Sequence, residues 1–80
     1  MNIRLRCFSH IKYALGRDEL TLELPDGSSA GDLIARVREM GGAALASIPV
    51  RAAVNQMYVD PVEVLHDGDE VALIPPVQGG

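Results

Sequence analysis

The residues that could do chemistry stand in the run Pro75-Pro76-Val77-Gln78-Gly79-Gly80, where the sequence stops. Prolines lack a backbone N–H and hold φ at about −65°, so they end strand pairing and stiffen the chain beyond them. Six extended residues reach roughly 20 Å. The last two have no side chain, which suits entry into a narrow pocket, and no Cβ crowds the Gly80 carboxylate. The α-carboxylate of Gly80 is then the reactive group at the tip of this run. An ordinary terminal segment is the alternative, because chain ends often contain glycine.

The other groups that could react or bind a metal are isolated. The single cysteine, Cys7, excludes an internal disulfide, and its apolar surroundings indicate a buried thiol rather than a nucleophile. His10 and His66 have no clustered ligands beside them, so we expect no metal site. The run Asp67-Gly68-Asp69-Glu70 lacks the spacing of a calcium loop and is typical of a tight turn.

Size and charge exclude several function classes. Eighty residues allow one small domain, and 48% apolar composition is enough for it to fold. The net charge is −4, and residues 52–80 hold five acidic residues and no Lys or Arg. Nucleic-acid binding is therefore not expected. The acidic third suggests docking on a basic protein surface, or else a solvated face. No apolar run is long enough for a signal or a membrane span, so we expect no membrane partner and a cytoplasmic protein.

Two segments near the start alternate apolar and polar residues with period two. They are residues 2–8 and 19–24, and this period is that of a half-buried strand. Paired antiparallel, they are predicted to set Arg4 or Arg6 across from Glu23 on the exposed face. By the same alternation, Phe8 is predicted to lie on the face opposite the core.

The strongest helical pattern covers residues 29–40. Its apolar residues recur at helical spacing, Ser29 begins it with Asp32 as a capping-box partner, and Gly41-Gly42 ends it. Gly41 is predicted to adopt the left-handed conformation. Within the connection 9–18, weaker helical spacing predicts a helical turn.

Three more strands are predicted, at residues 50–54, 57–59 and 70–74. Asn55-Gln56 is predicted to turn the chain between the first two. In the last strand Val71 to Ile74 are all apolar, which is typical of a central strand or of one whose second face meets a partner. This order predicts an α+β fold of the β-grasp type: a mixed sheet with one main helix packed across it, in residues 1–74, and an extended tail at 75–80.

Several segments together resemble a known family. They are the opening strand ending at Phe8, Leu24-Pro25-Asp26-Gly27 ahead of Asp32-Leu33, Ala53-Val54-Asn55 with Tyr58-Val59, and the whole of residues 67–80. On these residues the chain resembles the ubiquitin-like sulfur carriers, and most closely the small subunits of molybdopterin synthase. Two residues depart from the family pattern: Ile74 stands where an aromatic is frequent, and Gln78 where a small residue is common.

The resemblance implies a sacrificial carrier without catalytic machinery or bound cofactor of its own. It implies that a ubiquitin-activating-type enzyme uses ATP to adenylate Gly80, and that a sulfur donor then converts it to a thiocarboxylate. The carrier would dock on the large subunit of the synthase, in a heterotetramer, with the tail 75–79 threading into the active site. Sulfur would pass there to a pterin precursor, and two deliveries would build the molybdopterin dithiolene of the molybdenum cofactor. We expect Phe8 and Ile74 to form part of the partner interface; the alternative for Phe8 is that the 9–18 connection covers it.

Other functions fit the same tail. A sulfur carrier for thiazole, tRNA thiolation or amino-acid synthesis would share the fold and the Gly80 chemistry. A ubiquitin-like modifier would join Gly80 to lysines of target proteins, and a plain binding module would have an inert tail.

Overall fold

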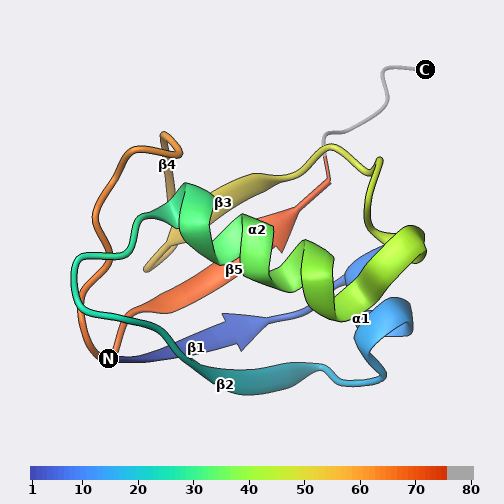
Figure 1. The fold of residues 1–80 in the computed structure, drawn as a ribbon, viewed down its shortest axis with the longest axis horizontal. Coiled ribbons are helices and arrows are strands. Elements are labelled where there is room, and N and C mark those ends of the chain that lie inside the picture. Colours follow the sequence, from blue (N-terminus) through green and yellow to red (C-terminus); the bar gives the residue numbers. More distant parts are fainter. Residues whose placement is uncertain (76–80) are drawn as a thin grey trace.

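The computed structural model describes residues 1–75 as a five-stranded sheet with two helices on one of its faces (Figure 1). The elements in chain order are β1 (Asn2–Arg6), α1 (Ser9–Leu15), β2 (Glu19–Glu23), α2 (Ala30–Gly41), the 3-10 turn η1 (Gly42–Ala44), β3 (Arg51–Val54), β4 (Met57–Val59) and β5 (Glu70–Ile74). The strand predictions are confirmed in position, within one or two residues at their ends.

The strands lie side by side in the order β2-β1-β5-β3-β4. β1 pairs parallel with β5, and the other neighbours are antiparallel, so the sheet is mixed as predicted. The last strand of the chain is therefore the middle of the sheet. The α+β prediction of the β-grasp type, with one main helix across a mixed sheet, is confirmed.

The register of β1 against β2 contradicts one prediction. Glu23 lies opposite Asn2, whereas Arg4 lies opposite Thr21 and Arg6 opposite Glu19. Neither arginine faces Glu23, because the register is determined by the whole connection through α1 rather than by the charges. Ser9 turns the chain away from the sheet directly after Phe8. Its backbone φ is 52°, a value that residues other than glycine rarely adopt.

The long helix α2 begins as predicted and ends one residue later than predicted. The Ser29 hydroxyl accepts from Asp32 N at 3.2 Å, and the Asp32 carboxylate accepts from Ser29 N at 2.9 Å, which completes the capping box. The prediction of a left-handed Gly41 is wrong: Gly41 is the last helical residue, and Gly42 adopts the positive φ of 58°. A Cβ on Gly41 would collide with the side chain of Leu45, which η1 brings into the core.

The core lies between the sheet and the two helices. Every second residue of the strands points into it, and these residues pack against apolar residues of α1 and α2. The buried set is Ile3, Leu5, Cys7, Ile11, Leu22, Leu24, Ala30, Leu33, Val37, Leu45, Ala52, Leu65, Val71 and Leu73. The remaining strand residues point to the opposite face, called here the open face, because neither α1 nor α2 packs on it.

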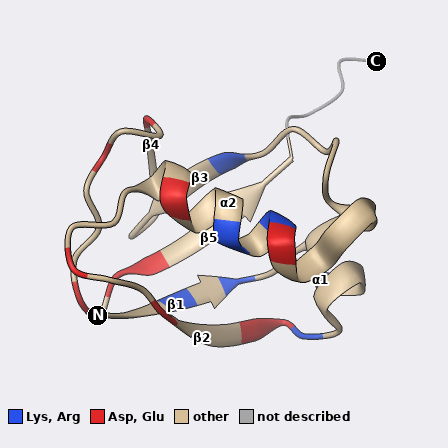
Figure 2. Ribbon diagram, in the orientation of Figure 1, with Lys and Arg blue, Asp and Glu red and all other residues tan. Residues whose placement is uncertain are grey.

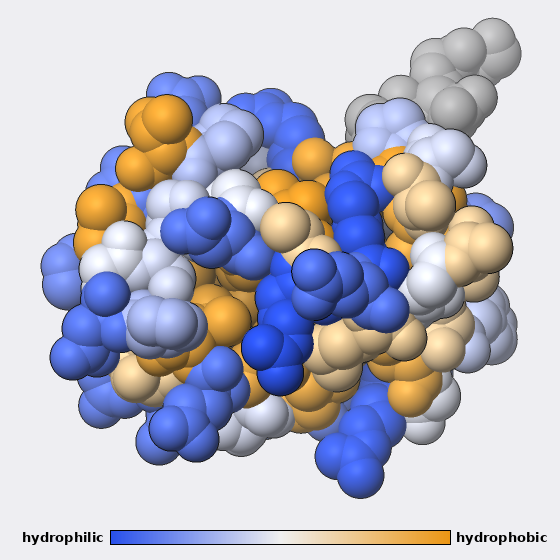
Figure 3. Space-filling model, viewed as in Figure 1, coloured by the Kyte–Doolittle hydropathy of each residue, from blue (hydrophilic) through white to orange (hydrophobic). Residues whose placement is uncertain are grey.

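Charged residues are distributed unevenly over the fold. Acidic segments follow the loop between β4 and β5, whereas arginines mark β1 and β3 (Figure 2). On the helix side of the molecule, hydrophilic side chains lie over α2 with apolar residues around them (Figure 3). Within residues 1–75 no helix combines the length and the apolar character needed to cross a membrane.

Candidate functional site

The open face carries an apolar hollow that brings together the two residues predicted for the partner interface. Phe8 follows β1 and Ile74 ends β5, and these strands are parallel neighbours, with Arg6 opposite Ala72. Both side chains line the same hollow, together with Arg6, Ala53, Gln56, Tyr58, Glu70 and Ala72. Phe8 is 44% exposed, so α1 does not cover it. The covered alternative for Phe8 is therefore wrong.

Small residues explain why the surface is hollow at this point. Ala53 and Ala72 are paired across β3 and β5, and Tyr58 lies opposite Ala53 on β4. Two methyl groups side by side leave a depression that the larger Phe8, Ile74 and Tyr58 surround. Sequence reasoning missed Tyr58, Ala53 and Ala72, although their alternation with the buried Ala52, Val71 and Leu73 could have placed them on this face.

Two arginines lie against the aromatic rings of the hollow. The guanidinium carbon of Arg6 lies 5.9 Å from the centre of the Phe8 ring, and that of Arg51 lies 4.5 Å from the centre of the Tyr58 ring. Both distances are within the range of cation–π attraction. The rim of the hollow therefore combines aromatic surface with fixed positive charge.

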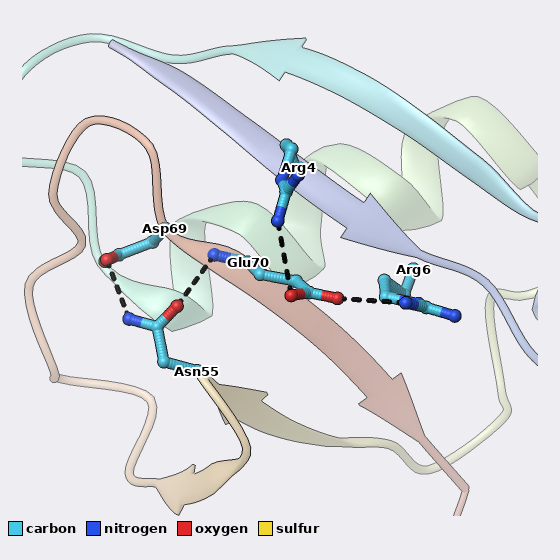
Figure 4. A network of polar contacts seen from close by, with 5 residues as sticks. All are labelled: Arg4, Arg6, Asn55, Asp69 and Glu70. Carbon is cyan, nitrogen blue, oxygen red and sulfur yellow. Dashed lines mark hydrogen bonds and ion pairs between the residues drawn. The ribbon is translucent and has the colours of Figure 1, made fainter.

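A single carboxylate links the arginines of β1 to the central strand. Glu70 Oε2 accepts from Arg4 Nη2 at 3.3 Å and its Oε1 accepts from Arg6 Nη1 at 3.2 Å (Figure 4). Asn55 holds the start of β5, since its Oδ1 accepts from Glu70 N at 3.1 Å and its Nδ2 donates to Asp69 Oδ1 at 3.0 Å. Because exposed ion pairs add little stability, the main effect of this network is to position the arginines.

The predicted tail leaves the fold beside this hollow. β5 ends at Ile74 and Pro75 comes next, outside the sheet, as expected of a residue without an N–H. The other predicted tail residues, Pro76, Val77, Gln78, Gly79 and Gly80, lie outside the described residues. The assignment of 75–80 as an extended tail stays a prediction.

The remaining candidate groups have structural roles. Cys7 is buried in the core, and its burial, with the Asp18 carboxylate as a smaller cause, raises the pKa of the thiol, which keeps it protonated and unreactive. Asp67 and Asp69 accept backbone N–H groups of Asn2 and His66, so they form a turn, as predicted. Among residues 1–75, no three His, Cys, Asp or Glu side chains gather as a metal site would require.

A mixed sheet crossed by one long helix, with its last strand in the middle and an apolar hollow where that strand ends, defines a ubiquitin-like β-grasp protein. The model of the ThiS family matches residues 5–80. The chain belongs to this family.

Comparisons with individual proteins agree with this assignment. The chain is 42% identical to a molybdopterin synthase sulfur carrier subunit of Chlamydomonas reinhardtii over 84 aligned positions, which cover all of both chains. It superimposes with a TM-score of 0.87 and 30% identity on a putative molybdopterin converting factor, subunit 1, from Pyrococcus furiosus, covering 96% of this chain and 99% of that one. It also matches a complex of subunits 1 and 2 of the molybdopterin-converting factor from Helicobacter pylori, with a TM-score of 0.69 and 26% identity over all of both chains.

Proposed function

We propose that this protein is the sulfur carrier subunit of a molybdopterin synthase. The observation that carries the proposal is the 42% identity to the Chlamydomonas carrier along the entire length of both chains. The match of the family model through residue 80 supports it, because it includes the Gly79-Gly80 end on which the chemistry depends.

The reactive group in this proposal is the carboxylate of Gly80. A carboxylate is a poor electrophile, so an activating enzyme first transfers AMP from ATP to it and releases pyrophosphate. A hydrosulfide equivalent from a sulfur donor enzyme then attacks the acyl carbon; a C–S bond forms, the bond to the AMP oxygen breaks, and AMP leaves. The thiocarboxylate sulfur is a soft nucleophile that displaces an oxygen substituent from a carbon of the pterin precursor. Water then cleaves the resulting thioester, so the sulfur stays on the pterin and the Gly80 carboxylate is regenerated. Two such deliveries supply the two sulfurs of the dithiolene.

The groups needed for sulfur transfer are divided between this chain and its partner enzymes. The carrier supplies the reactive group and its delivery, whereas the pocket, acids and bases belong to the enzymes on which it docks. The Helicobacter complex of subunits 1 and 2 supports a large subunit as one of these partners. In this assembly the hollow around Phe8 and Ile74 is the surface that meets the large subunit, since it lies where β5 ends and the tail begins.

The proposal is tested by the intact mass of the protein after incubation with ATP, an activating enzyme and a sulfur donor. We expect the mass to rise by the difference between one sulfur and one oxygen, with fragmentation placing the change on Gly80. A variant without Gly80 should melt at the same temperature and gain no sulfur, and Gly79→Val should slow adenylation by crowding the narrow pocket.

Three results would contradict the proposal. The first is sulfur transfer by the variant that lacks Gly80. The second is a wild-type protein that stays unmodified with several active activating enzymes, which would favour a binding module. The third is a thiocarboxylate that is formed but never consumed by a large subunit with a pterin precursor, which would favour a carrier for another pathway. Covalent conjugates between Gly80 and lysines of other proteins in a lysate would reveal a modifier role in addition to the carrier role.

A further inference from the structure

The charge of the open face near the hollow differs from the charge of the whole protein. The chain has a net charge of −4. On the four strands that form the hollow, however, the open face carries Arg4, Arg6 and Arg51 against one carboxylate, Glu70. Two arginines share that carboxylate, so it cannot neutralise both. A docking partner therefore meets positive charge at the hollow.

Of the five acidic residues in 52–80, all of which the structure describes, Glu70 alone lines the hollow. Asp67 and Asp69 are engaged in the turn before β5, at the opposite end of that strand from Ile74. Asp60 and Glu63 belong to the loop after β4, where they border a second hollow together with Arg51 and Tyr58. On β2, Glu19 and Glu23 share the open face but lie on the far side of β1 from the hollow.

The arginines remain available to a partner. The side chains of Arg4 and Arg6 are 55% and 50% exposed although both contact Glu70, and Arg51 is exposed while it lies over Tyr58. A guanidinium stacked on a ring keeps its N–H groups at the edge, where they can donate to a carboxylate in the same plane. Arg6 and Arg51 contact opposite sides of the hollow, one at Phe8 and the other at Tyr58.

We infer that the hollow docks an apolar surface rimmed by carboxylates, and that Arg6 and Arg51 select this partner by pairing with those carboxylates. This inference rests on the proposed function and assigns the acidic-rimmed surface to the large subunit of the synthase. Glu70 and Asn55 are positioning residues, which hold Arg4 and Arg6 in place before the partner arrives. The inference replaces the expectation from composition alone that the acidic third would seek a basic surface.

Charge reversal with a matched control tests the inference. The association rate constant of the full-length protein with its purified large subunit is measured at low and at high salt. The variants are Arg6→Glu and Arg51→Glu, and the control is Arg36→Glu, an exposed residue of α2 on the opposite side of the sheet. All three lower the net charge equally, so only the position of the charge differs. Thermal melting checks the fold, and Arg6→Gln and Arg51→Gln serve if a reversal unfolds the protein.

We expect each open-face reversal to slow association by about tenfold at low salt and by much less at high salt, because salt screens the attraction. The glutamine variants should slow it by about threefold, and Arg36→Glu should change it by less than about twofold. Equal effects at all three positions, or faster association after an open-face reversal, would overturn the inference. If such a result is found while the thiocarboxylate still forms and the large subunit still binds, the inference about the arginines is overturned and the proposed function is kept. A wild-type protein that binds no large subunit overturns both.

Discussion

The two faces of the sheet contrast sharply although the same strands build both. On β5, Val71 and Leu73 point to the helices and are at most 1% exposed, whereas Glu70, Ala72 and Ile74 point to the open face and stay partly exposed. The first set packs against α2 and the second surrounds a hollow. Alternate residues of one strand can therefore carry stability and recognition separately.

Two adjacent residues directly after β1 show the same contrast between a buried and an open face. Cys7 is 3% exposed in the core, and Phe8, the next residue, is 44% exposed on the open face. Cys7 gains stability from nearly complete burial, whereas the half-exposed Phe8 ring removes less of its apolar area from water on folding. Phe8 therefore leaves apolar surface on the open face, as the predicted partner interface requires.

The largest effect is expected on the helix-covered face. Leu33 of α2 is fully buried, so Leu33→Ala should lower the free energy of unfolding by about 2–5 kcal/mol through lost burial and a cavity. In an 80-residue domain this is much of the total stability. Urea denaturation measures it, with the exposed Ala35→Gly on the same helix as the control, which should cost about 1 kcal/mol. A loss from Leu33→Ala no greater than that of the control would break the contrast between the faces.

An intermediate effect is expected on the open face, and in binding rather than in folding. Phe8→Ala should change stability by less than about 1 kcal/mol. It should weaken association with the large subunit by about 2 kcal/mol, the loss typical of a central aromatic in an interface. Isothermal titration measures the affinity, and Tyr13→Ala on α1, an aromatic that is 83% exposed, is the matched control. Equal affinities for the two variants would remove Phe8 from the interface.

The smallest effect is expected from the Cys7 thiol. Burial raises its pKa above the value in the unfolded chain, so the folded protein holds the proton to a higher pH. The unfolded state then binds fewer protons in that window, and the stabilising contribution of the thiol is lost as the pH rises above about 8.5. Urea midpoints of wild type and Cys7→Ala between neutral and alkaline pH should converge as the pH rises. Midpoints that separate further would show that the thiol ionises more easily in the fold.

Much of the fold could be predicted because its signals are local. The capping box of Ser29 and Asp32 lies within one helical turn, and the alternation in β1 and β2 needs only neighbouring residues. Asn55 and Gln56 form the predicted turn with φ values of 48° and 71°, although neither is glycine. By contrast, the prediction for Gly41 was wrong by one residue, since the end of α2 depends on where Leu45 packs.

The sequence by itself determined which residues form strands, which face of each strand is apolar and where the candidate reactive end lies, because these depend on the periodicity of the backbone and on residue type. Only the tertiary structure decided that β5 lies between β1 and β3, which joins Phe8 to Ile74 and Glu70 to Arg4 and Arg6. Glu70 is more than sixty residues from both arginines, and no local pattern could choose it over Glu23 as their partner. Strand order and register depend on the packing of the whole chain around one core, and the charge around the hollow depends on them in turn.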